Sequence, residues 1–282
     1  MRERYEPASA GVERLTYGSY LHVPELLGLQ RELSKPAHHD ELLFIVSHQV
    51  YELWFKQMLH EVAAVCDWLD RDLPLRAAQL FDRLHAIQHL LIEQIPLLET
   101  MFAVDFNQFR DHLRPASGFQ SVQFRKLEFL CGAKNPKMVR LVGEDDAAQR
   151  DLEAALRRPT LYDHFLRHLA RSGFAIPQPV LARDVTLPHA ADDGVVGALV
   201  RLYRESDEHY PQFRLAEHLL EFDERFALWR FHHVKMVERM IGSHAGTGGS
   251  SGAKYLAATL GMRFFPEIWL VRDRLTTGYG TG

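Results

Sequence analysis

An unbroken run without glycine or proline, residues 40 to 70, most strongly limits what this chain can fold into. When the run is drawn as a helix, its apolar side chains cover nearly every side, which is typical of a helix buried in a protein interior. Asp40 stands where an N-cap residue would begin this helix. The run therefore predicts a long, buried helix.

Helical patterns continue along most of the remaining chain, and proline and glycine mark the breaks between them. Ser117 and Gln120 have the spacing of a capping box at the start of one helix. A segment rich in proline, glycine and aspartate, residues 172–194, predicts an irregular connection. The other helices are expected over residues 75–100, 101–113 (stopped before Pro115), 118–131, 195–209, 211–241 and 253–262.

No segment has the alternating apolar pattern of a strand, and the sequence contains no repeat. We therefore predict an all-α protein with a single domain, residues 1–282, built on a bundle of long helices. The N-terminal segment, residues 1–20, is expected to lie outside this bundle.

Composition excludes several classes of function. The net charge is −4, and no basic run follows the pattern of a nucleic-acid-binding surface. No apolar run approaches the length of a membrane span, and the N-terminus lacks the apolar core of a signal peptide. The only cysteines, Cys66 and Cys131, form no disulfide framework, which favours a reducing compartment. We expect a cytoplasmic protein that binds neither nucleic acid nor membrane.

The sequence has 16 histidines, and two of them lie on aromatic helix faces. His48 shares its face with Phe44, Tyr51 and Phe55, so its imidazole is expected in an apolar wall. A core histidine that bonds a backbone carbonyl would show the same pattern. The spacing alone does not separate a ligand or substrate contact from this structural role.

The adjacent histidines His232 and His233 lie on different faces of the predicted helix 211–241. The face of His233 carries Phe222, Phe226 and Trp229, whereas that of His232 carries Arg225, Lys235 and Arg239. His233 is therefore expected to point inward, where large flat side chains could grip a porphyrin and leave a ring nitrogen for the iron. A structural core histidine is the alternative. Zinc and di-iron motifs do not occur with the required spacing.

Arg110 and a glycine-rich loop are candidates for binding a charged ligand. Arg110 lies one turn from Phe106, so its guanidinium could clamp a carboxylate in a partly apolar pocket; a surface ion pair is the alternative. The turn before residue 118 leads into a helix N-terminus, which can hold an anion such as a haem propionate. Residues 246–252 match no phosphate-binding motif, and they favour either a loop that closes over a ligand or a linker. Thr247 is one of the loop's few polar side chains.

Five segments of this sequence resemble tryptophan 2,3-dioxygenases, and they occur in the order found in that family. The resemblance covers residues 15 to about 270. The segments are LTYGSYL near the N-terminus, FIVSHQVYELWFKQMLHE, FRDHLRPASGFQSVQFR, WRFHHVKMVERMIG and GTGGSSGAKYL.

This resemblance implies an enzyme that inserts both atoms of O2 into the indole C2–C3 bond of L-tryptophan. The product is N-formyl-L-kynurenine, in the first step of the kynurenine pathway. The resemblance also implies a homotetramer, arranged as a dimer of dimers, with one haem b per subunit whose iron is ferrous in the active form.

The family pattern assigns roles to individual residues. It makes His233 the axial ligand of the haem iron, and it places Ser117 and Gly118 beside the haem. It makes His48 a catalytic residue that hydrogen-bonds the indole N–H. The other expected substrate contacts within the same chain are Phe44, Phe106, Arg110 and Thr247. The family pattern also implies that Tyr17, Tyr20 and Leu21 contribute to the substrate pocket of a neighbouring subunit.

Three alternatives follow from the same residues. A non-catalytic haem sensor of gas or redox state would need no amino-acid clamp, so Arg110 and the 246–252 loop argue against it. An indoleamine 2,3-dioxygenase with a broader substrate range is the second alternative. The LTYGSYL segment and the two expected contacts to an α-amino acid argue against it. In a helical scaffold without a cofactor, the aromatic faces of His48 and His233 would be ordinary core.

Overall fold

The computed structural model describes residues 15–143, 145–242, 244, 246–247 and 253–275, and it is all-α, with no strand among these residues. Residues 1–14 of the predicted N-terminal segment and residues 248–252 of the glycine-rich loop lie outside this part of the chain. The helices are α1 (Tyr17–Leu21), α2 (Val23–Leu27), α3 (His39–Asp70), α4 (Pro74–Glu93), α5 (Ile95–Leu98), α6 (Ala103–Arg110), η1 (Asp111–Leu113), η2 (Gly118–Gln120), α7 (Val122–Cys131), η3 (Pro136–Val142), α8 (Asp146–Leu156), α9 (Leu161–Arg171), α10 (Gln178–Leu181), α11 (Asp193–Arg204), α12 (Tyr210–Ile241), α13 (Ala253–Ala258) and α14 (Pro266–Leu275).

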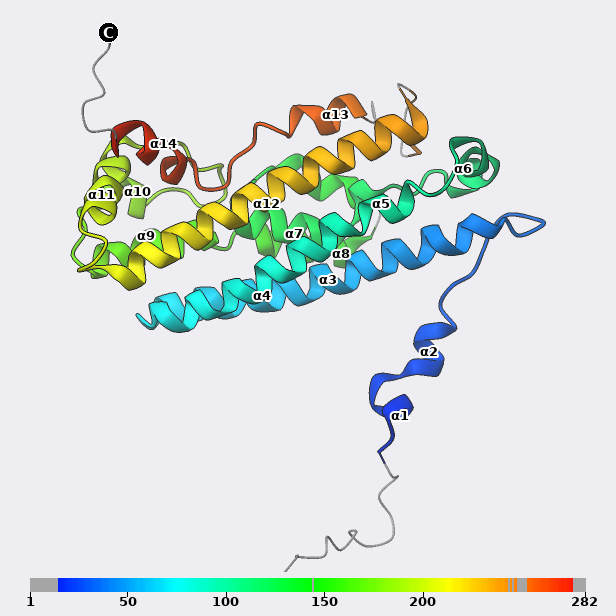
Figure 1. The fold of residues 1–282 in the computed structure, drawn as a ribbon, viewed down its shortest axis with the longest axis horizontal. Coiled ribbons are helices and arrows are strands. Elements are labelled where there is room, and N and C mark those ends of the chain that lie inside the picture. Colours follow the sequence, from blue (N-terminus) through cyan, green and yellow to red (C-terminus); the bar gives the residue numbers. More distant parts are fainter. Residues whose placement is uncertain (1–14, 144, 243, 245, 248–252, 276–282) are drawn as a thin grey trace, which may run out of the picture.

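Three long helices, α3, α4 and α12, form the body of the molecule (Figure 1). Helix α4 packs against both α3 and α12. Met58 of α3, Phe81 of α4 and Phe222 of α12 are fully buried in the core that the three helices share. Helices α7 and α9 pack on α3, and α11 packs on α14 at one end of the bundle. The predicted bundle of long helices is confirmed.

Proline and capping side chains explain where the observed helices differ from the predicted bounds. The predicted helix 75–100 is divided into α4 and α5 at Gln94, because Pro96 offers no N–H to continue the ladder. The predicted helix 118–131 is divided at Ser121, whose hydroxyl caps α7 by accepting from the Phe124 N–H at 3.2 Å. Asp40 was wrongly predicted as the N-cap of α3; His38 has this position, and its ring accepts from the Asp40 N–H.

Two further differences lie towards the C-terminus. The predicted connection 172–194 contains the short helix α10 and the first residues of α11, whose N-cap is Asp192. Helix α13 ends at Ala258, before the predicted limit of 262, and α14 follows at Pro266, where no helix was predicted.

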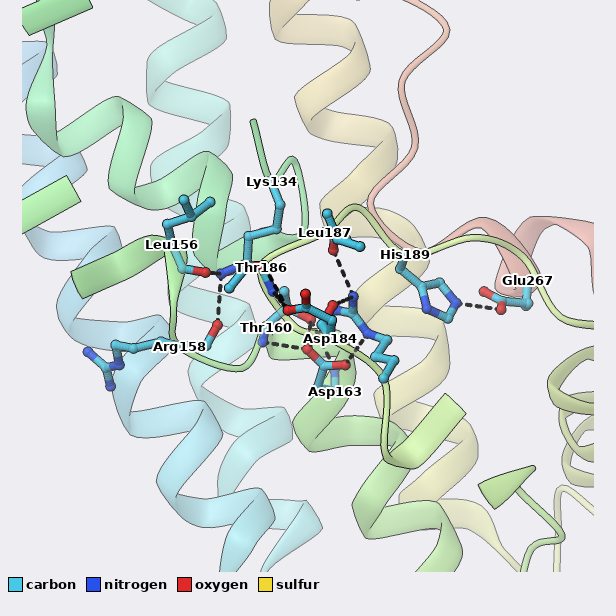
Figure 2. A network of polar contacts seen from close by, with 11 residues as sticks. Lys134, Leu156, Arg158, Thr160, Asp163, Asp184, Thr186, Leu187, His189 and Glu267 are labelled. Carbon is cyan, nitrogen blue, oxygen red and sulfur yellow. Dashed lines mark hydrogen bonds and ion pairs between the residues drawn. The ribbon is translucent and has the colours of Figure 1, made fainter. Parts of the chain in front are cut away.

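A buried polar network joins the elements beside α9 (Figure 2). The ammonium of Lys134 is buried and donates to the carbonyl oxygens of residues 155, 156 and 158, at distances of 2.7–3.0 Å, at the end of α8. Asp163 accepts from the guanidinium of Arg183, and His189 bonds Glu267 at 2.6 Å. Because cations stabilise helix C-termini, Lys134 acts as a cap for α8.

Helices α1 and α2 extend away from the bundle (Figure 1). Neither helix buries a residue, and most of their apolar side chains are exposed, as shown by Tyr17, Tyr20 and Leu27 at 78, 69 and 71%. Among the described helices, none is long and apolar enough to cross a membrane.

Candidate active site

One cavity of about 320 Å³ lies among α3, α6, η2, α7, α12 and α13. Its size falls within the range of small-molecule and cofactor pockets. The structure thereby brings together side chains from segments that are far apart in the sequence. Eight of the predicted site residues line it: Phe44, His48, Phe106, Arg110, Ser117, Gly118, His233 and Thr247.

His48 presents one ring nitrogen to the backbone and leaves the other for the cavity. Its Nδ1 lies 2.7 Å from the carbonyl oxygen of Phe44. Because a carbonyl oxygen only accepts, Nδ1 carries the proton, and Nε2 is a lone-pair acceptor that no described residue bonds. The His48 side chain keeps exposed surface, and the apolar residues packed around it lower its pKa, which favours a neutral ring at pH 7. The ring of Phe44 lies 4.1 Å away, centroid to centroid.

His233 lines the same cavity from α12, whereas its neighbour His232 is exposed. This is the orientation that the helix faces predict. The His233 ring is stacked on Trp229 at 5.3 Å, with 20° between the ring planes. Burial lowers the pKa of His233 to about 4, and repulsion from His48 contributes to this fall. Within the described part of the chain no group hydrogen-bonds this neutral ring.

Arg110 is the last residue of α6, and it is only 9% exposed. Phe106, one turn earlier, packs against Phe44 at 5.6 Å between ring centroids. A guanidinium at the edge of this aromatic cluster is screened weakly by water, so its attraction for an anion is stronger than it would be at a surface. The site therefore combines an apolar slot with a cation at one end.

Thr247 connects the end of α12 to the turn before η2. Its hydroxyl donates to the carbonyl oxygen of Ala116 at 2.6 Å. Ser117, the next residue, forms the predicted capping box with Gln120. A Cβ atom added to Gly118 would meet nothing within 4 Å, so this backbone leaves open space at the cavity wall.

Tyr17, Tyr20 and Leu21 lie on α1 and do not line the cavity of their own chain. They are 78, 69 and 45% exposed. Their predicted contact is with the pocket of another subunit, which a single chain does not test.

A buried charged cluster in the cavity wall was missed by the sequence analysis. Glu128 forms an ion pair with Arg125, and its other oxygen lies 3.7 Å from Arg230. Burial raises the pKa of Glu128, and the two arginines oppose this rise. Two guanidinium groups therefore face the Glu128 carboxylate beside the cavity, and Asp223 also attracts Arg230. Arg125 and Arg230 both lie within the quoted family segments, so the signal was present in the sequence.

The cavity fits the haem that the sequence predicts. Flat side chains, including Phe55, Phe124 and Trp229, form its apolar walls, and His233 offers an unprotonated nitrogen between them. The buried Nε of Arg125 has no hydrogen-bond partner among the described residues, so an anionic group of a ligand could satisfy it. The donors therefore match an apolar ring system with a carboxylate edge.

Comparison with known proteins agrees with this geometry. The family model for tryptophan 2,3-dioxygenase matches residues 5–172 and 177–275. A tryptophan 2,3-dioxygenase of Xanthomonas campestris pv. campestris (strain B100) is 46% identical over 259 residues, which are 92% of this chain and 87% of that protein. A tryptophan 2,3-dioxygenase of Kineococcus radiotolerans is 43% identical over 261 residues, 93% of this chain and 91% of that protein. The chain therefore belongs to the tryptophan 2,3-dioxygenase family.

Proposed function

We propose that this protein is a haem-dependent dioxygenase that converts L-tryptophan and O2 to N-formyl-L-kynurenine, the first step of the kynurenine pathway. The observation that carries the proposal is the cavity in which Arg110, His48 and His233 meet. These side chains supply an anion clamp, a hydrogen-bond acceptor and a metal ligand, the three groups that this reaction requires. No feature of the described residues favours the alternative of a haem sensor.

Arg110 and Thr247 bind the amino-acid end of the substrate. The guanidinium of Arg110 pairs with the carboxylate, and the Thr247 side chain contacts the ammonium and carboxylate groups. The hydroxyl of Thr247 has two lone pairs besides the proton that it donates to Ala116, so it can accept from an ammonium without losing that bond.

Phe44, Phe106 and His48 bind the indole. The two phenylalanines form the apolar slot, and Nε2 of the neutral His48 accepts the indole N–H. Two polar contacts at opposite ends of the substrate fix the direction of the ring, so that C2 and C3 are presented to the oxygen. His48 accordingly orients the substrate and is not required to remove a proton.

In this proposal, His233 would hold the iron of a b-type haem. The ferrous haem, when bound, supplies the oxygen chemistry that no side chain provides. Arg125 would hold a carboxylate at the haem edge, and Ser117 and Gly118 would pack beside the ring. The neutral state of His233 favours this role, because a protonated imidazole has no lone pair for iron.

We further propose that the chain forms a homotetramer, a dimer of dimers, through the exposed apolar face of α1 and α2. Tyr17, Tyr20 and Leu21 would complete the substrate pocket of a neighbouring subunit. A large exposed apolar surface is typical of an interface. Both cysteines are free, which supports a location in the reducing cytoplasm.

Product analysis tests the function directly. The purified, reduced protein is mixed with L-tryptophan under ¹⁸O2, and the product is examined by mass spectrometry. We expect N-formylkynurenine that carries two ¹⁸O atoms. The variant His233→Ala should lose haem and nearly all turnover, whereas the matched control His232→Ala should keep both. A haem protein that leaves tryptophan unchanged would refute the proposal.

A further inference from the structure

A second group of metal-binding side chains lies between α4 and α12, outside the cavity. His85 comes from α4, and His218 and Glu221 come from adjacent turns of α12. Both histidines are 6% exposed, and Glu221 is partly exposed. His218 precedes His233 on the same helix by about four turns, which places the group roughly 22 Å along α12 from the candidate haem ligand.

The spacing of the three ligand atoms suits a small cation. Nε2 of His85 lies 3.2 Å from Nδ1 of His218 and 3.6 Å from Oε2 of Glu221, and all three atoms fall within 4.8 Å of one another. In a tetrahedral site with bonds of about 2.0–2.1 Å, neighbouring ligand atoms are about 3.3–3.4 Å apart. The two distances from His85 Nε2, 3.2 Å to His218 and 3.6 Å to Glu221, lie on either side of this value.

A second hydrogen bond orients His85 towards the cluster. The side-chain N–H of Gln88 donates to the carbonyl oxygen of Phe222 at 2.8 Å, so the Gln88 oxygen faces Nδ1 of His85 at 3.3 Å. Nδ1 of His85 therefore carries the proton, and Nε2 points its lone pair at His218 and Glu221. Histidines that bind metals commonly donate their second nitrogen to an oxygen in this way.

Glu221 brings a negative charge to this lone pair. Its Oε1 accepts two bonds from Arg225, at 2.9 and 2.7 Å, which leaves Oε2 directed at His85. Two electron-rich atoms thus converge on one point, an arrangement that a cation between them would stabilise.

Arg214 competes with a metal at His218. One guanidinium nitrogen of Arg214 lies 3.2 Å from Nε2 of His218, so in this geometry Nε2 accepts and Nδ1 carries the proton. Coordination through Nδ1 moves that proton to Nε2, and Arg214 must then turn away. The Arg214 side chain is exposed and has room to do so.

We propose that His85, His218 and Glu221 bind one divalent transition-metal ion of the zinc class, which links α4 to α12. The mixed imidazole and carboxylate ligands suit such an ion, and a water molecule would fill the fourth position. The site is separate from the candidate haem ligand, and its function is to strengthen the packing of the two helices.

Equilibrium dialysis of the haem-loaded protein against ZnCl2, with zinc and iron measured separately by mass spectrometry, tests this proposal. We expect one zinc per chain with micromolar or tighter affinity, and at least a tenfold loss of affinity in His85→Gln and in Glu221→Gln. His89→Gln and Glu224→Gln, exposed neighbours on the same two helices, serve as matched controls and should bind as the wild type does. If His85→Gln fails to fold, the partly exposed Glu221→Gln carries the test.

Two further measurements complete the design. Zinc should raise the Tm of the wild type but not that of Glu221→Gln. Arg214→Ala should bind zinc about tenfold more tightly, because it removes a cation that faces a ligand. Absence of a stoichiometric zinc, zinc binding unchanged in both ligand variants, or weaker binding by Arg214→Ala would each overturn the proposal and leave His85, His218 and Gln88 as a hydrogen-bonded chain.

Discussion

Lowering the pH from 7 to 4 should destabilise the haem-free protein by up to about 3 kcal/mol through His233 alone. Burial lowers the pKa of this residue to about 4 in the folded chain. An unfolded histidine titrates near a pKa of about 6.5. Between these values the unfolded state binds a proton that the folded state does not. The unfolded state is therefore favoured as the pH falls, and below about pH 4 the loss of stability levels off.

The size of the effect follows from the two pKa values. Stability changes by about 1.4 kcal/mol per pH unit for one proton, so the interval between the two pKa values gives about 3 kcal/mol as an upper limit. Water in the haem-free cavity would reduce this value. The neutral state at pH 7 is the state that a metal ligand requires.

Urea denaturation of two variants isolates this contribution. His233→Gln cannot titrate, so its free energy of unfolding should fall less than that of the wild type between pH 7 and pH 4, by about 2–3 kcal/mol. Other groups titrate in both proteins and cancel in the difference. His232→Gln, which removes an exposed histidine from the same turn, should behave as the wild type. A difference below about 1 kcal/mol for His233→Gln would refute the argument that the ring is held neutral by burial.

Three other outcomes can be checked. Arg110→Leu should raise the KM for tryptophan by about 100-fold in steady-state kinetics, with Arg110→Lys in between, because a buried charge-assisted pair is lost; an unchanged KM would exclude Arg110 as the carboxylate clamp. His48→Ala should keep measurable N-formylkynurenine formation, because His48 only orients the indole; an inactive variant with normal haem content would contradict this. Asp223 accepts from the backbone N–H groups of Phe264 and Phe265 and from Trp269 Nε1. Asp223→Ala should therefore lower the free energy of unfolding by about 3 kcal/mol or more in urea, and a loss below about 1 kcal/mol would mean that water replaces these bonds.

The long helices could be predicted from the sequence because their signals are local. Helices α3 and α12 lack internal glycine, and His48 and His233, which the sequence placed on their aromatic faces, both line the cavity. The shorter helices were harder to predict from the sequence. The patterns gave no bounds for residues 132–171, where α8 and α9 form, although Thr160 and Asp163 have the spacing of the capping box that begins α9.

The charged wall of the cavity shows why the site was only partly predictable. Arg125 and Glu128 are one turn apart on α7, which alone indicates no more than an ordinary helical ion pair. Arg230 comes from α12, much later in the chain, and only tertiary packing brings it within 3.7 Å of Glu128. The pairing of two arginines from different helices with one buried carboxylate exists only after folding.

The position of α12 explains why distant substitutions should affect the cavity. This one helix carries His233 and Arg230 at the cavity, and Asp223 two turns earlier fixes the chain segment that leads into α14. Phe264 in that segment also packs its ring under the guanidinium of Arg230, at 4.9 Å. A loss of the Asp223 bonds therefore frees the aromatic support of Arg230, so we infer that part of the geometry of the cavity depends on a carboxylate that does not line it.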